Sequence, residues 1–263
     1  MPDNQWDAND YAANSSAQFK WATELASKLS FSENENVLDI GCGDGKITKV
    51  LAEKVPLGHV VGIDNSERMI SYARHHNLSG NISYHVMDAR RISLGNTFSV
   101  VFSNAALHWV DDHPAVLRGI KKHLQSTGRV LLQMGGKGNI REIAEVINRV
   151  KSSPSYKDYF THFSHSYYFH DIDDYEKWLA EAKLKAVRIE LIPKEMKHDS
   201  PDQLKGWIRT TKFPYLNQLP DDITRENFLR DVLEQYLEQY PVDEEGRTTV
   251  KMVRLEIEAE NIP

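Results

Sequence analysis

Three glycines, Gly41, Gly43 and Gly45, alternate with other residues directly after the apolar run Val37–Ile40. Asp39 stands two residues before the first of them, which gives the pattern D-x-G-x-G-x-G. Glycine lets a backbone approach a ligand closely where a strand turns into a helix. The spacing therefore predicts a ligand-binding turn at the end of a buried strand.

Three classes of ligand site use such a turn. A phosphate-binding P-loop needs G-x-x-x-x-G-K-[ST], but here Lys46 is followed by Ile47, and Ile40 occupies the place of the first glycine. A dinucleotide site needs glycine where Lys46 stands, because a side chain there would crowd the helix against the sheet. The remaining pattern resembles motif I of the class I S-adenosylmethionine (SAM) methyltransferases.

Polar residues follow the next two apolar runs. Asp64 comes 19 residues after the last glycine, where an acid accepts hydrogen bonds from ribose hydroxyls, although it could also cap a helix. Asn65 follows it, and Met69 could pack on an adenine face or belong to the core. Asp88 and Ala89 end the third run, where this superfamily reads the adenine amino group. The carboxyl ends of three strands thus predict one binding edge.

Apolar runs and helical patterns alternate between residues 16 and 135, which predicts βαβ units and a parallel sheet. The resemblance to class I methyltransferases implies an α/β, Rossmann-like fold with a mostly parallel seven-stranded sheet and helices on both faces. The strands predicted from the runs are Val37–Ile40, His59–Asp64, Ile82–Asp88, Phe98–Asn104 and Gly128–Met134, followed by strand character at 185–196 and 247–261.

We expect a single domain over residues 1–263, because the sequence contains no repeat and no low-complexity linker. Residues 1–135 would form the cofactor-binding half. Residues from about 136 to 180, which are dense in aromatics, and from 198 to 245 would be substrate-side insertions, the first of them a helical and aromatic lid.

Three further stretches resemble the trans-aconitate methyltransferase group, to which insect juvenile-hormone-acid and biotin-pathway malonyl methyltransferases are related. They are WDANDY at the start, FSNAALHWVDDHPAVL after the fourth strand, and LKGWIRTTKFPYLNQL with FLRDVLEQYLEQYP near the end. The last segment, with Trp207, Arg209 and Pro214, is the most specific of the three. The resemblance covers nearly the whole chain and is weaker at Gly135–Asn139.

The resemblance implies a role for each matching residue. The cofactor site would comprise Gln18, Asp39, Gly41, Gly43, Gly45, Asp64, Asn65, Met69, Asp88, Ala89, Asn104 and Ala105. The substrate side would comprise Trp6, Tyr11, Trp109, Tyr168, Trp207 and Arg209, with Tyr167 and His170 in the same aromatic stretch. Plainer roles are a terminal anchor for Trp6, core packing for Trp109 and for the aromatic stretch, and a solvated surface charge for Arg209.

Relatives of this kind esterify small carboxylic acids. A carboxylate is ionised at neutral pH and needs no general base, so the protein would mainly position it, with Arg209 as its planar two-pronged partner and His108 beside the methyl group. Alternatively, a small phenol, amine or carbon acid could accept the methyl group, with His108 or His165 as base. A third hypothesis, from another class, is a catalytically silent SAM-binding module.

Composition argues against several partners. The formal charge of −6 at pH 7 disfavours nucleic acid and anionic membranes, and Asn104-Ala105-Ala106-Leu107 lacks the Asn/Asp-Pro-Pro-Tyr/Phe loop of DNA and amide methylation. Cys42 is the single cysteine, so we expect no disulfide and no metal site. No apolar run is long enough to span a membrane. A cytoplasmic monomer or weak homodimer acting on a small molecule is the prediction.

Overall fold

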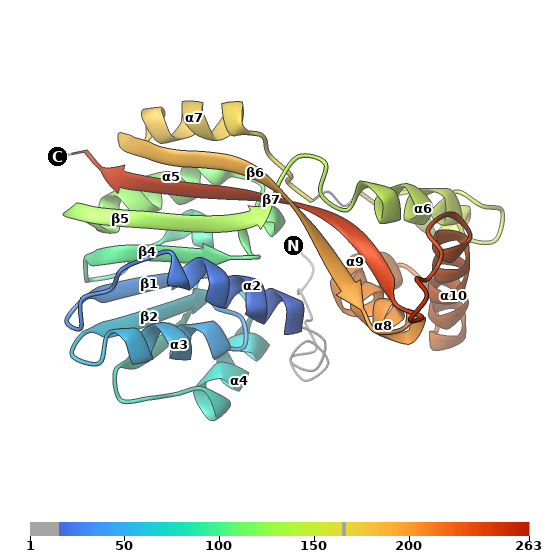
Figure 1. Cartoon of the computed structure of the whole chain (residues 1–263), viewed down its shortest axis with the longest axis horizontal. Helices are drawn as coiled ribbons and strands as arrows, with labels where there is room; N and C mark the ends of the chain where they lie inside the picture. Colours follow the sequence, from blue (N-terminus) through green and yellow to red (C-terminus); the bar gives the residue numbers. More distant parts are fainter. Residues whose placement is uncertain (1–15, 165–166, 263) are drawn as a thin grey trace.

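The computed structural model describes residues 16–164 and 167–262 (Figure 1). Seven strands form one sheet in the order β3-β2-β1-β4-β5-β7-β6. The strands β1 to β5 run parallel, and β7 pairs antiparallel with both β5 and β6. This arrangement confirms the predicted α/β fold with a mostly parallel seven-stranded sheet.

The strands are β1 (Asn36–Ile40), β2 (His59–Asp64), β3 (Ile82–Val86), β4 (Phe98–Asn104), β5 (Leu124–Gly135), β6 (Leu184–His198) and β7 (Thr248–Asn261). The α-helices are α2 (Ser16–Ser27), α3 (Lys46–Lys54), α4 (Glu67–His76), α5 (His113–His123), α6 (Arg141–Lys151), α7 (Ile172–Glu181), α8 (Pro201–Thr211), α9 (Phe213–Leu216) and α10 (Asp222–Gln239). Short 3₁₀ helices are η1 (Ala89–Arg91), η2 (Leu107–Trp109) and η3 (Lys157–Phe160).

Helices cover both faces of the sheet, because parallel strands must be buried on each side. The alternation of side chains along β1 shows the division: Val37 packs with α2, α3 and α4, whereas Leu38 and Ile40 pack with α5 and α7. Asp39 therefore points to the same face as Val37, where α3 supplies Thr48. Two separate apolar clusters result, one on each face.

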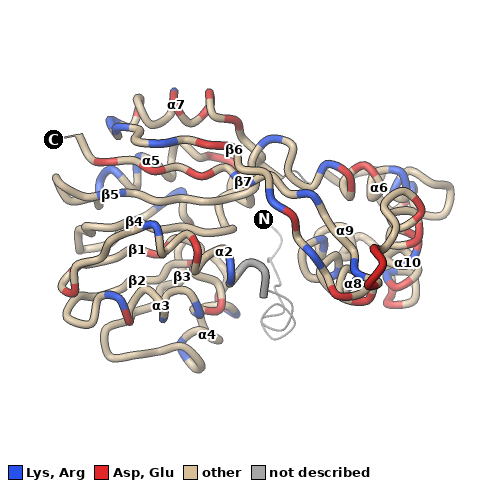
Figure 2. The backbone as a smooth tube through the Cα atoms, viewed as in Figure 1, with Lys and Arg blue, Asp and Glu red and all other residues tan. Residues whose placement is uncertain are grey.

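The strands β6 and β7 extend far beyond their neighbours. They pair with each other from Leu184↔Asn261 to His198↔Thr248, whereas β5 leaves β7 at Gly135↔Arg254. The free part of this ribbon carries α6, α8, α9 and α10, which pack together as an outer lobe (Figure 1). In Figure 2, acidic and basic residues are mixed along both the sheet domain and this lobe.

The segment from 136 to 180, expected to be one lid, divides between these two parts. Its helix α6 packs in the outer lobe, where Ile143, Val146 and Ile147 are buried. Its other helix, α7, instead buries Tyr175 and Leu179 against the sheet. The second expected insertion, 198–245, forms the rest of the lobe. The helical pattern alone could not show which apolar surface each helix covers.

A buried carboxylate joins three elements near the middle of the sheet. Glu256 on β7 is fully buried and accepts hydrogen bonds from Lys28 Nζ at 2.7 Å and 2.9 Å, Arg188 Nη2 at 2.5 Å and Gln133 Nε2 at 2.8 Å. These donors hold its pKa below the ordinary value although burial opposes them. The network fixes the end of α2 on the sheet.

Replacing this carboxylate should destabilise the fold. We expect Glu256→Ala to lower the free energy of unfolding by about 2–3 kcal/mol, because Gln133 and two cations lose their acceptor. Denaturant unfolding would measure the change. Glu260→Ala, on the same strand but exposed, is the control, expected to stay within about 0.5 kcal/mol of the wild type. Equal losses in the two variants would contradict a structural role for the network.

Candidate functional site

The glycine turn after β1 is held from β2. The backbone N–H groups of Gly41 and Cys42 both donate to the carbonyl of Ile63, at 2.8 Å and 3.0 Å. The next donor along the turn, Gly43 N–H, reaches the Asp64 carboxylate at 3.0 Å. Asp64 also accepts from Ser66 N–H at 2.9 Å, so one carboxylate fixes the glycine turn and the start of α4 together.

The three glycines are needed for different reasons, although all have positive φ angles. A Cβ on Gly41 would come within 2.1 Å of the Ala106 side chain, and one on Gly45 within 2.5 Å of the Tyr84 hydroxyl. A Cβ on Gly43 would meet no described atom within 4 Å, because this residue borders open space. Gly41 and Gly45 permit close packing, while Gly43 leaves room for a ligand.

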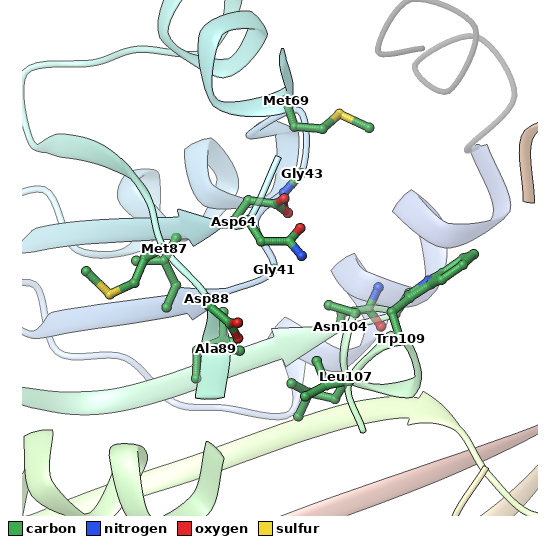
Figure 3. Close-up of a pocket in the computed structure, with 16 residues that line it drawn as sticks. Gly41, Gly43, Asp64, Met69, Met87, Asp88, Ala89, Asn104, Leu107 and Trp109 are labelled. Atoms are coloured by element: carbon green, nitrogen blue, oxygen red, sulfur yellow. Dashed lines mark hydrogen bonds between the residues drawn. The ribbon is translucent and has the colours of Figure 1, made fainter. Parts of the chain in front are cut away.

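That open space belongs to a cavity at the carboxyl ends of β1, β2, β3 and β4 (Figure 3). Most of the predicted cofactor residues line it: Gly41, Gly43, Asp64, Asn65, Met69, Asp88, Ala89, Asn104 and Ala105. The remaining lining residues are Ile40, Ile63, Met87, Ala106, Leu107, Trp109 and Val110. These additional lining residues are mostly apolar and lie at or near the ends of the predicted strands. Their residue types alone could not distinguish cavity lining from hydrophobic core.

Two carboxylates with different environments face this cavity. Burial raises the pKa of Asp64 above its ordinary value, while its two backbone donors oppose the shift. Asp88 caps η1, and its hydrogen bonds with Arg90 hold its pKa below the ordinary value. Hydroxyl or amino groups of a ligand would find an acceptor at each place.

The residues at the carboxyl end of β4 also fit SAM. The Asn104 amide oxygen is buried and accepts no hydrogen bond from any described residue, so an acceptor remains for a bound ligand. Ala105 has a φ of 55°, a left-handed conformation that costs a non-glycine residue energy. With the open side of Gly43, these groups suit a ligand that has a nucleoside at one end and an amino acid at the other.

Two predicted cofactor residues that the structure describes, Asp39 and Gly45, do not line the large cavity. Asp39 instead borders a smaller adjoining cavity, shared with Gly41, Gly43 and Asn104, and accepts a hydrogen bond from Thr48 Oγ1 at 2.7 Å. Burial raises the pKa of Asp39 to about 7. Gly45 packs against Tyr84 on the far side of the turn. Gln18 lies in α2, but the description does not extend to its side chain.

A further cavity adjoins the first where Ala105 and Trp109 line both. It lies between the sheet and the outer lobe, and its other lining residues are Trp21, His108, Asn139, Ile140, Tyr167, Phe169, Met196, Trp207, Thr211, Lys212, Met252 and Arg254. Apart from His108 and the two cations, its wall is mainly aromatic and apolar. We call it the acceptor cavity.

His108 is a neutral imidazole at this place. Burial lowers its pKa well below the ordinary value, and the positive charges of Arg254 and Lys212 lower it further. Its Nδ1 accepts a long hydrogen bond, 3.4 Å, from Gly135 N–H, which leaves the ring proton on Nε2. His108 can therefore donate a hydrogen bond but is a poor base.

The sequence interpretation missed the two cations of the acceptor cavity. Lys212 follows α8 and is 4% exposed, and Arg254 lies on β7 and is 3% exposed. Arg254 stands where the ribbon leaves β5, so only the pairing register could place it at this junction. The one available signal was the position of Lys212 directly before the apolar and aromatic residues FPYL.

The other predicted substrate residues have different placements. Trp109 and Trp207, both predicted on the substrate side, line the acceptor cavity. Arg209 is exposed on α8 and lines neither cavity, so its role as substrate partner stays a prediction. Tyr168 also lines neither, because successive residues of an extended segment point to opposite sides and its two neighbours, Tyr167 and Phe169, face inward. Trp6, Tyr11 and His165 lie outside the described residues.

Comparison with known proteins agrees with this geometry. The sequence profile of a family described as "Methyltransferase domain" matches residues 31–195. The uncharacterised methyltransferase C70.08c of Schizosaccharomyces pombe is 30% identical over 243 residues, 89% of this chain and 91% of that protein. Trans-aconitate 2-methyltransferase of Acidovorax sp. is 25% identical over 265 residues, 99% and 100%.

Juvenile hormone acid O-methyltransferase of Bombyx mori is 29% identical over 228 residues, 82% of this chain and 77% of that protein. Among solved structures, a Bacillus halodurans protein described as a methyltransferase superposes with a TM-score of 0.60 at 18% identity, over 92% of this chain and 98% of the other. Because the sequence identity is only 18%, this structural similarity supports the fold and nothing further.

The described residues contain neither a membrane-spanning helix nor a cluster of metal ligands. In residues 16–164 and 167–262, no helix has the length and hydropathy needed to cross a bilayer. Over the same ranges, no group of three His, Cys, Asp or Glu side chains could hold a metal ion.

The Asp64 carboxylate should matter for cofactor affinity. We expect Asp64→Ala to weaken SAM binding by about 10- to 100-fold, because the turn loses two hydrogen bonds to a charged acceptor and the ligand loses a partner. Titration calorimetry with SAM would measure the affinity. Glu53→Ala, an exposed acid on α3, is the control and should bind as the wild type does. Wild-type affinity in Asp64→Ala would contradict the assignment.

The open side of Gly43 gives a second test. Gly43→Ala should cost the free protein only about 1 kcal/mol, the strain of a left-handed residue, yet weaken SAM binding at least about tenfold because its methyl group enters the cavity. Gly246→Ala is a matched control, since Gly246 has a φ of 77° and no described atom within 4 Å of its added Cβ, in a distant turn. Undiminished SAM affinity in Gly43→Ala would show that the ligand lies elsewhere.

Proposed function

The chain belongs to the methyltransferase domain family and is a SAM-dependent methyltransferase, and from this premise we propose that it esterifies a small organic acid. In this reaction, the methyl group of SAM passes to a carboxylate oxygen of the acceptor. The observation that carries the proposal is the composition of the acceptor cavity. It has two buried cations, and no acidic side chain is among its described lining residues.

A buried ammonium and guanidinium favour an anion as the ligand. Burying a cation costs solvation, and an opposite charge placed close to it offsets that cost. Arg254 presents a planar fork that matches the two oxygens of a carboxylate. A small acid therefore fits the charge of this cavity.

The neutral His108 favours an acceptor that needs no base. Phenols and ammonium groups are protonated at neutral pH and must lose a proton before they attack the methyl group. His108 holds its proton on Nε2 and has a lowered pKa, so it is unsuited to remove one. A carboxylate is already ionised and could instead accept a hydrogen bond from this Nε2–H.

An amine acceptor meets a further obstacle. Aromatic rings around a cavity can bind ammonium groups through cation–π contacts. In this cavity, however, the rings already contact the protein's own cations: Lys212 lies over the Tyr167 ring and Arg254 over the Trp21 ring, at 4.1 Å and 5.6 Å from the centroids. A positively charged acceptor would be repelled by the permanent charge of Arg254.

SAM supplies an activated methyl group on its sulfonium, so the protein's contribution is to position the acceptor and exclude water. Trp109 is placed for this, because it lines both cavities and packs edge-on against Tyr167 at 4.9 Å. Ala105 borders the same junction, and its small side chain takes up little room there. The junction is where donor and acceptor would meet.

The relatives support a carboxylate acceptor. Two of those described above are named as methyltransferases of acids, trans-aconitate and juvenile hormone acid, and each matches most of this chain. Their acceptors differ greatly in shape, so the names favour the reacting group and not a particular molecule.

A transfer assay with methyl-labelled SAM tests the proposal. The acceptors would be small di- and tricarboxylic acids, fatty acids, phenols and amines. We expect label to enter at least one acid and to leave as methanol in mild base, because methyl esters hydrolyse there. Base-stable label on a phenol or amine would contradict the proposal, and SAM binding without any transfer would favour a silent binding module.

Arg254 gives a residue-level test. We expect Arg254→Gln to raise the KM for the acid by at least about tenfold, because a charge-assisted contact is worth about 1.5–3 kcal/mol, while SAM affinity stays within twofold. Arg230→Gln, an exposed substitution on α10, is the control for lost charge. If Arg254→Gln lowers SAM affinity as much as it raises the acceptor KM, Arg254 does not act on the acceptor side.

A further inference from the structure

Lys212 is an unusual lysine because its amine ends inside the molecule. It follows α8 directly, is 4% exposed, and lines the acceptor cavity. Its Nζ lies 4.1 Å from the centroid of the Tyr167 ring and 5.4 Å from that of Trp207. Within residues 16–164 and 167–262, no hydrogen bond or ion pair engages this Nζ.

Two opposing effects set the charge of this amine. Both aromatic rings favour the ammonium form through cation–π contact. Burial opposes them, because an ammonium group without an anion loses most of its solvation. Burial has the larger effect and lowers the pKa of Lys212 from 10.5 to about 7. The amine is therefore poised between its two forms near neutral pH.

The neighbouring ionisable groups do not change charge in this range. The groups from the elements around Lys212 are His108 of η2, Tyr167 of the preceding loop, His198 of β6, Tyr215 of α9 and Arg254 of β7. Burial lowers the pKa of His198 to about 4 and that of His108 well below 6.5, and raises those of both tyrosines. Arginine stays charged. Lys212 is thus the one member of this set that titrates near pH 7.

We propose that Lys212 couples acceptor binding to proton uptake: its neutral amine takes one proton from the solvent as an acceptor carboxylate enters, and the new ammonium pairs with that carboxylate. This inference rests on the proposed function, since it needs a negatively charged acceptor. The proton balance is simple, with Lys-NH₂ and H⁺ giving Lys-NH₃⁺, and no group of the acceptor gains or loses a proton.

Such coupling makes Lys212 a specificity-determining residue. An uncharged analogue of the acceptor offers nothing to stabilise the ammonium, so it should bind without proton uptake and weakly. For an acid, affinity should fall by up to tenfold per pH unit above about pH 7, since each added unit removes a further tenfold of the protonated amine. A side chain at position 212 that is charged at every pH in this range would remove the pH dependence of acid binding.

Direct titration of Lys212 tests the coupling without turnover. The side-chain signal would be followed by NMR in protein saturated with S-adenosylhomocysteine and assigned by its loss in Lys212→Gln. The probes are succinate, trans-aconitate, benzoate and octanoate, with benzamide and octanamide as uncharged counterparts. We expect a midpoint near pH 7 without probe and a rise of at least about one unit with an acid, and none with an amide.

Two NMR results would overturn the inference. One is a midpoint above about pH 9 in the absence of any probe, the range of an unperturbed lysine. The other is a midpoint that no acid moves.

Kinetics separate this inference from the proposed function. For an acid that is methylated, KM should rise with pH between about pH 6 and pH 9 in the wild type, stay flat in Lys212→Arg, and be high and flat in Lys212→Gln, with kcat changing less. Lys205→Gln, on the preceding helix α8 and paired with Glu226, is the control for lost charge. Methylation with a flat wild-type KM would sink the coupling alone, whereas absence of ester product would sink the proposed function.

Discussion

One carboxylate holds the cofactor edge of this molecule together. Asp64, at the end of β2, accepts hydrogen bonds from Gly43 and Ser66, and so joins the turn after β1 to the start of α4. The parallel pairing of the two strands brings their ends level, with Ile40 opposite Ile63. Everything proposed for the methyl donor depends on this contact, because it fixes the turn whose open side, at Gly43, borders the cavity.

The second constraint is the balance of charge between two neighbouring cavities. Asp64 and Asp88 line the cavity proposed for the donor, and the basic residues Lys212 and Arg254 line the acceptor cavity. Lys212 and Arg254 line the acceptor cavity and not the larger cavity beside it, and Ala105 and Trp109 line both where the two adjoin. This distribution of charge would suit a positive donor beside the negatively charged acceptor that we propose.

Much of the donor side could be predicted from sequence, and little of the acceptor side. A glycine turn and Asp64 are local signals at fixed distances along strands that must be adjacent, so pattern and topology place them together. The acceptor cavity gathers α2, η2, α8 and β7, and its lysine depends on packing that no local pattern encodes. Tyr168 shows the limit clearly, since a one-residue change in an extended segment reverses the side that faces inward.

The most direct test of this account is the crystal structure of the protein with S-adenosylhomocysteine and an acid that it methylates. The account predicts the nucleoside end near Asp64, and the acid in the cavity lined by Lys212 and Arg254. One carboxylate oxygen should lie within roughly 3–4 Å of the position of the transferred methyl group, beside Ala105 and Trp109. An acid bound outside that cavity, with no contact to either cation, would contradict it.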